Sequence, residues 1–166
     1  LRYVRRVTEE AGIPLIADEV FTGFGRTGTM FACEHGPVTP DMMCLSKALT
    51  AGYLPLAATL CTSAIYQEFE REDPNATFLH GHSFTANPLA CAVALESLAI
   101  FDEDRCLERV GRLELLYRKR MEEVAQLPAV TSVRVLGGMA AAVLHPGGGT
   151  GTAGTSGSGG YFDELG

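Results

Sequence analysis

Two short apolar runs that stop abruptly at polar residues limit the folds open to this chain. Residues 14–17 run directly into Asp18, and residues 42–45 run into Ser46 and Lys47. Each run is too short for a buried helix and has the length of a strand buried in a parallel sheet. The carboxyl ends of parallel strands meet at one edge, where open α/β sheets bind ligands. We therefore expect Asp18 and Lys47 near each other at that edge.

The remaining periodic segments extend this α/β pattern and add a smaller unit. Helices are predicted over residues 1–11, 63–69, 88–101 and 105–127, and further strands over 56–61, 130–136 and 139–144. In the longest helix, the residues predicted to face inward are Leu107, Val110, Leu113, Leu116 and Val124. Asn87 and Pro88 have the residue types that cap and open a helix. We therefore predict that residues 1–103 are part of a large α/β domain and that 104–144 begin a small α+β domain.

The end of the sequence has a different composition. Residues 145–160 are mostly Gly, Thr, Ser and Ala and contain no large apolar side chain, so we predict a flexible surface segment. Residues 161–166 resume an ordered pattern as a truncated continuation. Because the chain also opens at Leu1 inside a helical pattern, we expect the sequence to be a fragment of a longer protein.

Composition argues against several classes of partner. The chain has 166 residues, 46% of them hydrophobic, and a net charge of −7. A negative surface disfavours nucleic acid and anionic membranes, and no apolar run approaches the roughly 18 residues of a membrane span. Five widely spaced cysteines without a CxxC pair predict free thiols in the cytoplasm, with neither disulfides nor a zinc site.

The chain has only two lysines, and their contexts predict different roles. Lys119 lies in the basic run 117–120 of a predicted helix, where a solvated charge is expected. Lys47 follows an apolar strand, which suits an amine that forms a Schiff base. With Asp18 beside it, the pair provides an amine for the aldehyde of pyridoxal phosphate and a carboxylate that keeps the pyridine nitrogen protonated. The structural alternatives are a lysine that only reaches solvent and an aspartate that only caps or forms an ion pair.

Two other motifs predict binding sites less strongly. Residues 23–28 fit the GxGxxG pattern, but no good helix opens there and acids precede the glycines, which disfavours a dinucleotide such as NAD. His80 and His82 have no carboxylate nearby, so we expect no metal site. Ser83 and Thr85 shortly precede a helix N-terminus and suit either a phosphate or a plain capping turn.

Four of these segments together resemble a known family, the class III pyridoxal-phosphate aminotransferases of the fold type I superfamily. The matching strings are LIADEVFTGFGRTG at 15–28, SKALT at 46–50, GYLPLAAT at 52–59 and HGHSFTANPL at 80–89. The resemblance extends to about residue 144 and is specific because several strings recur in order. The last two strings look most like a branch of the family that acts in biotin synthesis.

The resemblance implies a role for each matching residue. It gives Lys47 the bond to the cofactor aldehyde and the transfer of the substrate proton. It implies that Asp18 pairs with the protonated ring nitrogen of the cofactor and that Val20 packs on the face of the ring. It places Ser83, with His82, at the cofactor phosphate of the adjacent subunit. The family usually has Thr where Ser83 stands, so the hydroxyl group is kept.

The implied reaction moves an amino group from S-adenosylmethionine to 8-amino-7-oxononanoate in a cytoplasmic homodimer, with Gly81 and Lys47 contacting the substrate. An ω-amino acid:pyruvate transaminase of the same class and a non-catalytic truncated product are the alternatives. Family members are much longer, and the parts without a counterpart here carry a phosphate turn, a ring-stacking aromatic residue and a carboxylate-binding arginine. We therefore expect little or no activity from this chain alone.

Overall fold

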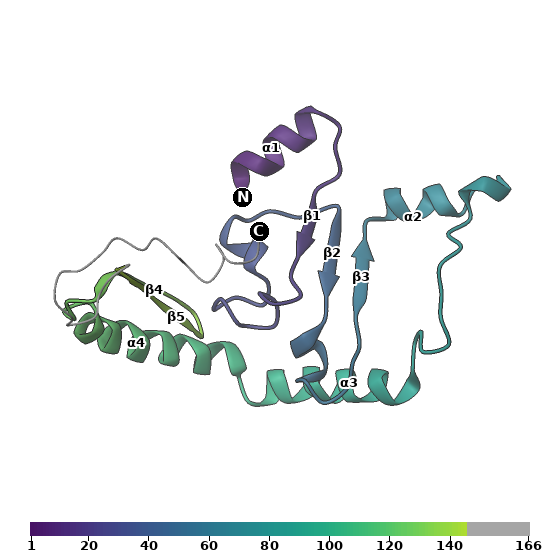
Figure 1. Cartoon of the computed structure of the whole chain (residues 1–166). Coiled ribbons are helices and arrows are strands. Elements are labelled where there is room, and N and C mark those ends of the chain that lie inside the picture. The colour runs from purple at the N-terminus through teal and green to yellow at the C-terminus, as the bar shows by residue number, and fades with distance from the viewer. Residues whose placement is uncertain (146–166) are drawn as a thin grey trace, which may run out of the picture.

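The computed structural model describes residues 1–145 (Figure 1). The helices are α1 (Arg2–Glu10), α2 (Ser63–Phe69), α3 (Pro88–Glu103) and α4 (Cys106–Val124), with short 3₁₀ helices η1 (Ala32–His35), η2 (Lys47–Thr50) and η3 (Pro74–Ala76). The strands are β1 (Ile16–Asp18), β2 (Met42–Leu45), β3 (Ala58–Cys61), β4 (Val130–Leu136) and β5 (Met139–Leu144). The predicted segments 145–160, apart from His145, and 161–166 lie outside the described residues.

The first three strands form one mixed sheet in the order β1-β2-β3. β1 and β2 are parallel, as predicted, with Asp18 opposite Cys44. β3 is antiparallel to β2, with Ala58 opposite Leu45. The connection 46–57 contains one 3₁₀ turn and no crossover helix, so the chain returns alongside β2 in the opposite direction. The sheet is therefore parallel only at its first pair.

Helix α3 supports the turn that carries Lys47. Asn87 caps the helix as predicted, because its Oδ1 accepts hydrogen bonds from the backbone N–H groups of Leu89 (3.0 Å) and Ala90 (3.2 Å). Ala90 and Ala94 are buried, and the small side chains let the helix approach η2 closely. The hydroxyl of Ser97 donates to the Ala48 carbonyl at 3.4 Å. In Figure 1 this helix crosses below the ends of β2 and β3.

One carboxylate attaches α1 to the sheet. Oδ2 of Asp41 accepts from Nη1 of Arg5 and from the backbone N–H of Leu15, both at 2.7 Å. Arg5 belongs to α1, and Leu15 leads into β1. Hydrogen bonds to a charged acceptor are the stronger kind, so Asp41 fixes the helix relative to the first strand.

The β4–β5 hairpin packs on α4 and contacts the glycine loop at 23–28. The carboxylate of Glu114 on α4 accepts from the Gly137 N–H at 2.9 Å, and the Gly138 N–H donates to the Arg26 carbonyl, also at 2.9 Å. Gly137 has φ +56, and a Cβ there would lie 2.3 Å from the carbonyl carbon of Thr27. Only glycine allows the two backbones to approach this closely.

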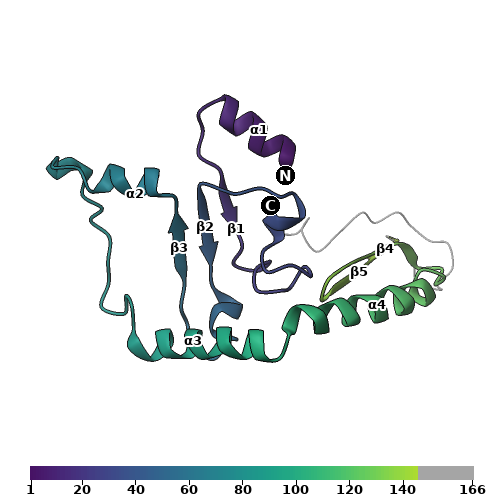
Figure 2. The ribbon, with the colours of Figure 1, turned by 180° about the vertical axis from the view of Figure 1, so that it is seen from behind.

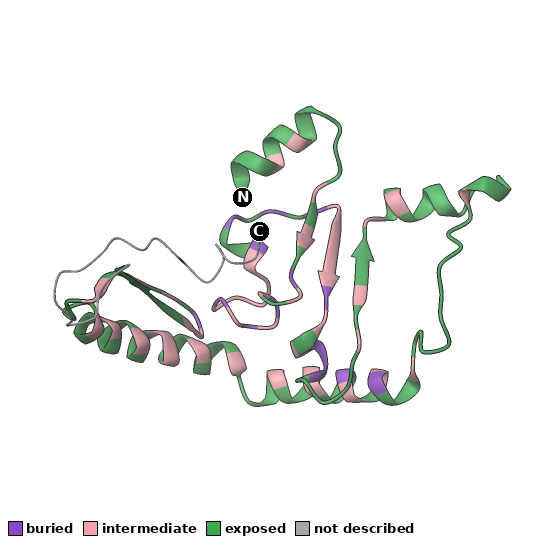
Figure 3. Cartoon of the chain, viewed as in Figure 1, coloured by how far each residue is buried: buried purple, intermediate pink, exposed green. Residues whose placement is uncertain are grey.

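Few side chains of this chain are fully buried (Figure 3). The buried apolar residues are Cys33, Val38, Leu45, Leu49, Ala90 and Ala94. Ile16 is 57% exposed, so the prediction of a buried first strand is wrong for this side chain, and Leu60 on β3 is 51% exposed. The reason is that no helix of residues 1–145 lies across a face of the sheet (Figures 1 and 2). No helix within that range is long and apolar enough to span a membrane.

Candidate functional site

Asp18 and Lys47 lie at the same edge of the sheet. β1 ends at Asp18 and the parallel β2 ends at Leu45, so both chains leave the sheet on one side. Ser46 is extended, and its hydroxyl donates to the Leu56 carbonyl at 2.7 Å. Lys47 then opens η2 with φ +46, a left-handed conformation uncommon for residues with a side chain. This sharp turn places Lys47 at the edge of the sheet where β1 ends at Asp18.

The Lys47 amine is exposed and contacts an aromatic ring. Its Nζ lies 5.1 Å from the centroid of the Phe21 ring, a cation–π distance. Within residues 1–145 it forms neither an ion pair nor a hydrogen bond. The amine is therefore accessible to a reactive carbonyl.

The Asp18 carboxylate is exposed and also has no ion pair among the described residues. Its Oδ1 accepts a hydrogen bond from the backbone N–H of Val20 at 3.0 Å. This bond closes a tight turn that directs the chain from β1 toward Val20, which is half-buried, and Phe21. Although Asp18 and Lys47 carry opposite charges at one edge, they do not pair with each other. Each charged group is therefore available to a ligand.

The turn after β1 is held by an acid whose role the sequence analysis missed. Glu19 is 3% exposed and accepts hydrogen bonds from the backbone N–H groups of Ala32 (3.0 Å) and Cys33 (2.8 Å) and from the hydroxyl of Thr22. Burial by itself raises the pKa of Glu19, but these hydrogen bonds together lower it below its ordinary value. The sequence does contain a signal for this role, namely a second acid directly after the end of the strand. Consecutive residues of an extended chain face opposite ways, so the two acids could not both face the same site.

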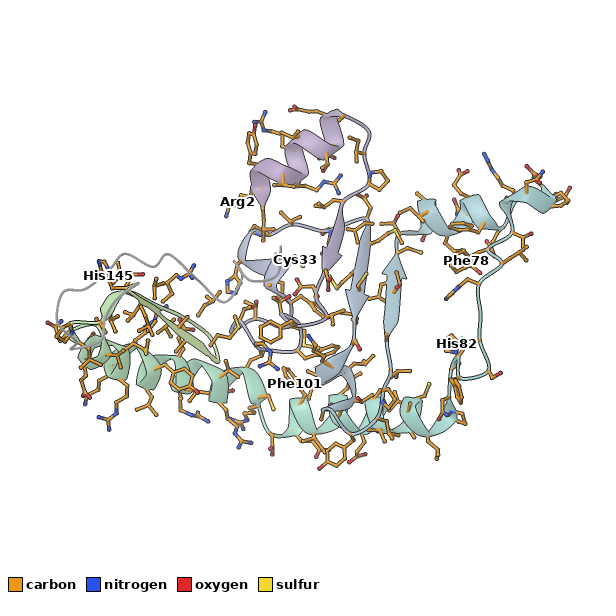
Figure 4. All side chains as sticks on the ribbon, in the orientation of Figure 1. Arg2, Cys33, Phe78, His82, Phe101 and His145 are labelled. Carbon is orange, nitrogen blue, oxygen red and sulfur yellow. The ribbon has the colours of Figure 1, made fainter. Side chains whose placement is uncertain are left out.

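The glycine loop has a packing function in this structure. A Cβ on Gly23 would lie 2.9 Å from the Glu19 carbonyl, and one on Gly25, which has φ +85, would lie 3.1 Å from the Phe101 ring (Figure 4). The loop leads into the 3₁₀ helix η1, and no α-helix opens at the glycines. The close contacts explain the glycines without a dinucleotide.

The other predicted site residues lie on the far side of β3. Gly81, His82 and Ser83 are exposed on the segment between η3 and α3 (Figure 4). A groove of about 730 Å³ separates this segment from the β2–β3 connection, with His80 and His82 on one wall and Ser46 and Leu56 on the other. The predicted residues thus form two groups, one with Asp18, Val20 and Lys47 and one with residues 81–83.

No cluster of three or more metal-ligating side chains occurs in the part of the chain that the structure describes. The edge residues instead fit pyridoxal phosphate. They offer an unpaired amine for its aldehyde, an unpaired carboxylate for its ring nitrogen, and apolar Val20 for its ring face.

Comparison with known proteins also identifies similarity to aminotransferases. The family described as "Aminotransferase class-III" matches residues 1–149. The adenosylmethionine-8-amino-7-oxononanoate aminotransferase of Synechococcus elongatus is 46% identical over 158 residues, which are 95% of this chain and 34% of that protein.

Solved structures of aminotransferases have the same fold. The adenosylmethionine-8-amino-7-oxononanoate aminotransferase of Methanocaldococcus jannaschii matches with a TM-score of 0.81 and 40% identity, over 86% of this chain and 34% of that one. The taurine:2-oxoglutarate aminotransferase of Bifidobacterium kashiwanohense, solved in complex with PLP and glutamate, matches with a TM-score of 0.79 and 30% identity, over 85% and 31% of the two chains. These matches confirm the predicted fold.

The chain spans about a third of the length of the relatives it matches. Class III aminotransferases use pyridoxal phosphate, the cofactor that the edge residues fit. The family match covers most of the chain. The chain therefore belongs to the class III aminotransferases.

Proposed function

We propose that this chain supplies the lysine and carboxylate edge of an aminotransferase that moves an amino group from S-adenosylmethionine to 8-amino-7-oxononanoate in biotin synthesis. The relatives named for these substrates support that choice. The observation that carries the proposal is the parallel pairing of β1 with β2, which brings an unpaired amine and an unpaired carboxylate to one edge.

Each edge residue has its own role in this proposal. The Lys47 Nζ would hold the cofactor through its aldehyde and would carry the proton removed from the substrate carbon next to the amino group. The Asp18 carboxylate would keep the proton on the ring nitrogen, and Val20 would pack against the ring. When bound, pyridoxal phosphate accepts the electron pair left on that carbon. The exposed position of Lys47 allows the substrate amine to reach it.

We further propose that residues 81–83 serve the neighbouring site of a homodimer. The Ser83 hydroxyl and the His82 side chain would bind the cofactor phosphate of the other subunit, and Gly81 would contact its substrate. Their exposure, and their separation from Lys47 by β3, suit a contribution to another subunit.

The organisation of the chain is also part of the proposal. We place the boundary between the large and small domains at residues 103–104, in the turn between α3 and α4. All five cysteines are free thiols, which suits the reducing cytoplasm in which we propose that the enzyme works.

The proposal is tested by adding pyridoxal phosphate and recording the absorbance band of the lysine Schiff base. We expect the band with the unmodified chain and with Lys119→Ala, and its loss with Lys47→Ala. Borohydride reduction followed by mass spectrometry should locate the cofactor on Lys47. Attachment at Lys119 alone, or a band that survives Lys47→Ala, would contradict the proposal.

The substrates need a separate test on the full-length enzyme that contains this sequence. We expect S-adenosylmethionine to convert the bound cofactor to its amine form and 8-amino-7-oxononanoate to reverse the change. An enzyme that instead accepts only an ω-amino acid with pyruvate would retain the class III chemistry but overturn the role in biotin synthesis.

A further inference from the structure

Two cations contact the ring of Phe21. The Lys47 Nζ lies 5.1 Å from the ring centroid, and the Arg26 guanidinium carbon lies 4.7 Å from it. Phe21 is 50% exposed, so part of the ring is available to these charges. The ring therefore links the two strand ends, because Phe21 follows β1 and Lys47 follows β2.

Within residues 1–145, the Lys47 amine has this cation–π contact with Phe21 and neither an ion pair nor a hydrogen bond. The Arg26 guanidinium also lacks an ion pair in that range, and its Nε is buried without a hydrogen-bond partner. Arg26 is fixed through its backbone, since its carbonyl accepts from the N–H of Gly138 in the hairpin turn. The turn thus holds Arg26, and Arg26 stacks on the ring that contacts Lys47.

The Phe21 ring borders open space. A groove of about 1130 Å³ lies between Phe21, α4 and the β4–β5 hairpin. A lysine side chain has many rotamers and loses them only where a contact selects some of them. The ring selects conformers that keep the amine at the sheet edge.

We propose that Phe21 is a positioning residue that holds the Lys47 ammonium whenever this amine is not bonded to the cofactor. The inference rests on the proposed function, in which the substrate amine displaces Lys47 from the cofactor. Because the ring stabilises the unbonded ammonium, it competes with covalent attachment. Replacing Phe21 should therefore strengthen the attachment of Lys47 to pyridoxal phosphate, whereas a ring that only supports the cofactor pocket would have the opposite effect.

The contact can be measured without cofactor because the chain has only two lysines. Protein containing ¹³C-labelled lysine gives two sets of side-chain NMR signals, which Lys119→Ala assigns. We expect the Lys47 ε-proton signal to be shifted upfield from that of Lys119 by the aromatic ring. The shift should disappear in Phe21→Leu and persist in Phe21→Tyr. Equal ε-proton signals for the two lysines in the unmodified chain would overturn the inference without any substitution at Phe21.

The competition is measured as the equilibrium constant for Schiff-base formation with pyridoxal phosphate. Exposed cation–π contacts correspond to about a 2–5-fold change in an equilibrium constant, so we expect a rise of that size in Phe21→Leu and none in Phe21→Tyr. Tyr3→Leu is the matched control, because it removes the contact of Tyr3 with Arg6 (5.3 Å) on α1. It should leave both readouts unchanged.

The outcomes separate the positioning role of Phe21 from the proposed function of the chain. An unchanged or lower equilibrium constant in Phe21→Leu overturns the positioning role. If the unmodified chain forms no Schiff base at all, the proposed function fails; a ring-shifted Lys47 signal would then support the contact, and its absence would refute it.

Discussion

At the residue scale, the acid that ends β1 and the acid that follows it have different environments. Asp18 is exposed, whereas Glu19 is 3% exposed and accepts three hydrogen bonds from the following loop. The exposed carboxylate lies at the candidate site, while the buried one fixes the turn behind it. The order of the site therefore depends on a residue that does not take part in the chemistry.

Glu19→Gln should destabilise the chain by about 1.5–3 kcal/mol, the range for hydrogen bonds to a charged group. The amide keeps one acceptor oxygen, but its NH₂ group faces backbone N–H donors. Chemical denaturation measures the loss. Glu9→Gln, at an exposed position on α1, should change the free energy of unfolding by less than about 0.5 kcal/mol. Equal effects of the two substitutions would show that Glu19 does not hold the turn.

The sequence predicted Asp18 and Lys47 at one edge but not the role of Glu19 or the exposure of the Lys47 amine. The edge follows from two apolar runs that pair in parallel, which is a local pattern. Glu19 depends on Ala32 and Cys33, more than ten residues away. That contact exists only after the loop has folded back.

At the element scale, the glycine loop and the β4–β5 turn form a joint between the sheet and α4. The Gly137 backbone lies against Thr27 and Gly28, and Glu114 holds the same turn from α4. The joint explains the glycine at position 137 by its close approach to the backbone of residues 26–28. The sequence around Gly137 does not show this contact by itself, because glycines also occur in ordinary turns.

Gly137→Ala should separate this joint. The new Cβ would lie 2.3 Å from the Thr27 carbonyl carbon and 2.4 Å from the Gly28 nitrogen, at a φ that disfavours alanine. We expect a destabilisation above about 1 kcal/mol, measured by denaturation, together with faster hydrogen exchange at the Gly138 N–H.

Gly111→Ala is the matched control, because Gly111 lies within α4 and nothing approaches its Cβ position within 4 Å. Alanine there should stabilise the chain by up to about 1 kcal/mol. A Gly137→Ala variant as stable as the unmodified chain would refute the joint.

The element bounds were easier to predict than the direction or packing of the elements. β4 and β5 occupy the predicted ranges 130–136 and 139–144. On α4, however, Leu116 is 51% exposed, and Tyr117 lines the groove toward the hairpin. The other predicted inward residues except Leu107 are half-buried. Which of residues 116 and 117 faces inward depends on where the hairpin docks, which periodicity does not specify.

At the scale of the whole molecule, three carboxylates join elements that are distant in the chain. Hydrogen bonds from Leu15 and then Arg5 hold the pKa of Asp41 below its ordinary value. Arg118 and the Gly137 N–H do the same for the pKa of Glu114, and the pKa of Glu19 is also lowered. Each group is charged in the folded chain at a pH where the unfolded chain is already taking up protons.

Acid should therefore weaken the fold. A lowered folded pKa gives stability that is fully present above the unfolded values, 4.5 for Glu and 3.8 for Asp, and that is lost as the pH falls toward the folded values. We expect these groups to lower the urea midpoint below about pH 4.5, with a shallower fall in Asp41→Asn. An identical pH dependence in the variant and the unmodified chain would show that Asp41 does not contribute.

The central claim is that one amine and one carboxylate act on a single cofactor ring. It is tested most directly by the ¹⁵N NMR signal of ring-labelled pyridoxal phosphate attached to Lys47 at neutral pH. We predict a protonated ring nitrogen in the unmodified chain and in the exposed control Asp102→Asn, and a deprotonated one in Asp18→Asn. The same ring-nitrogen signal in all three proteins would contradict the account.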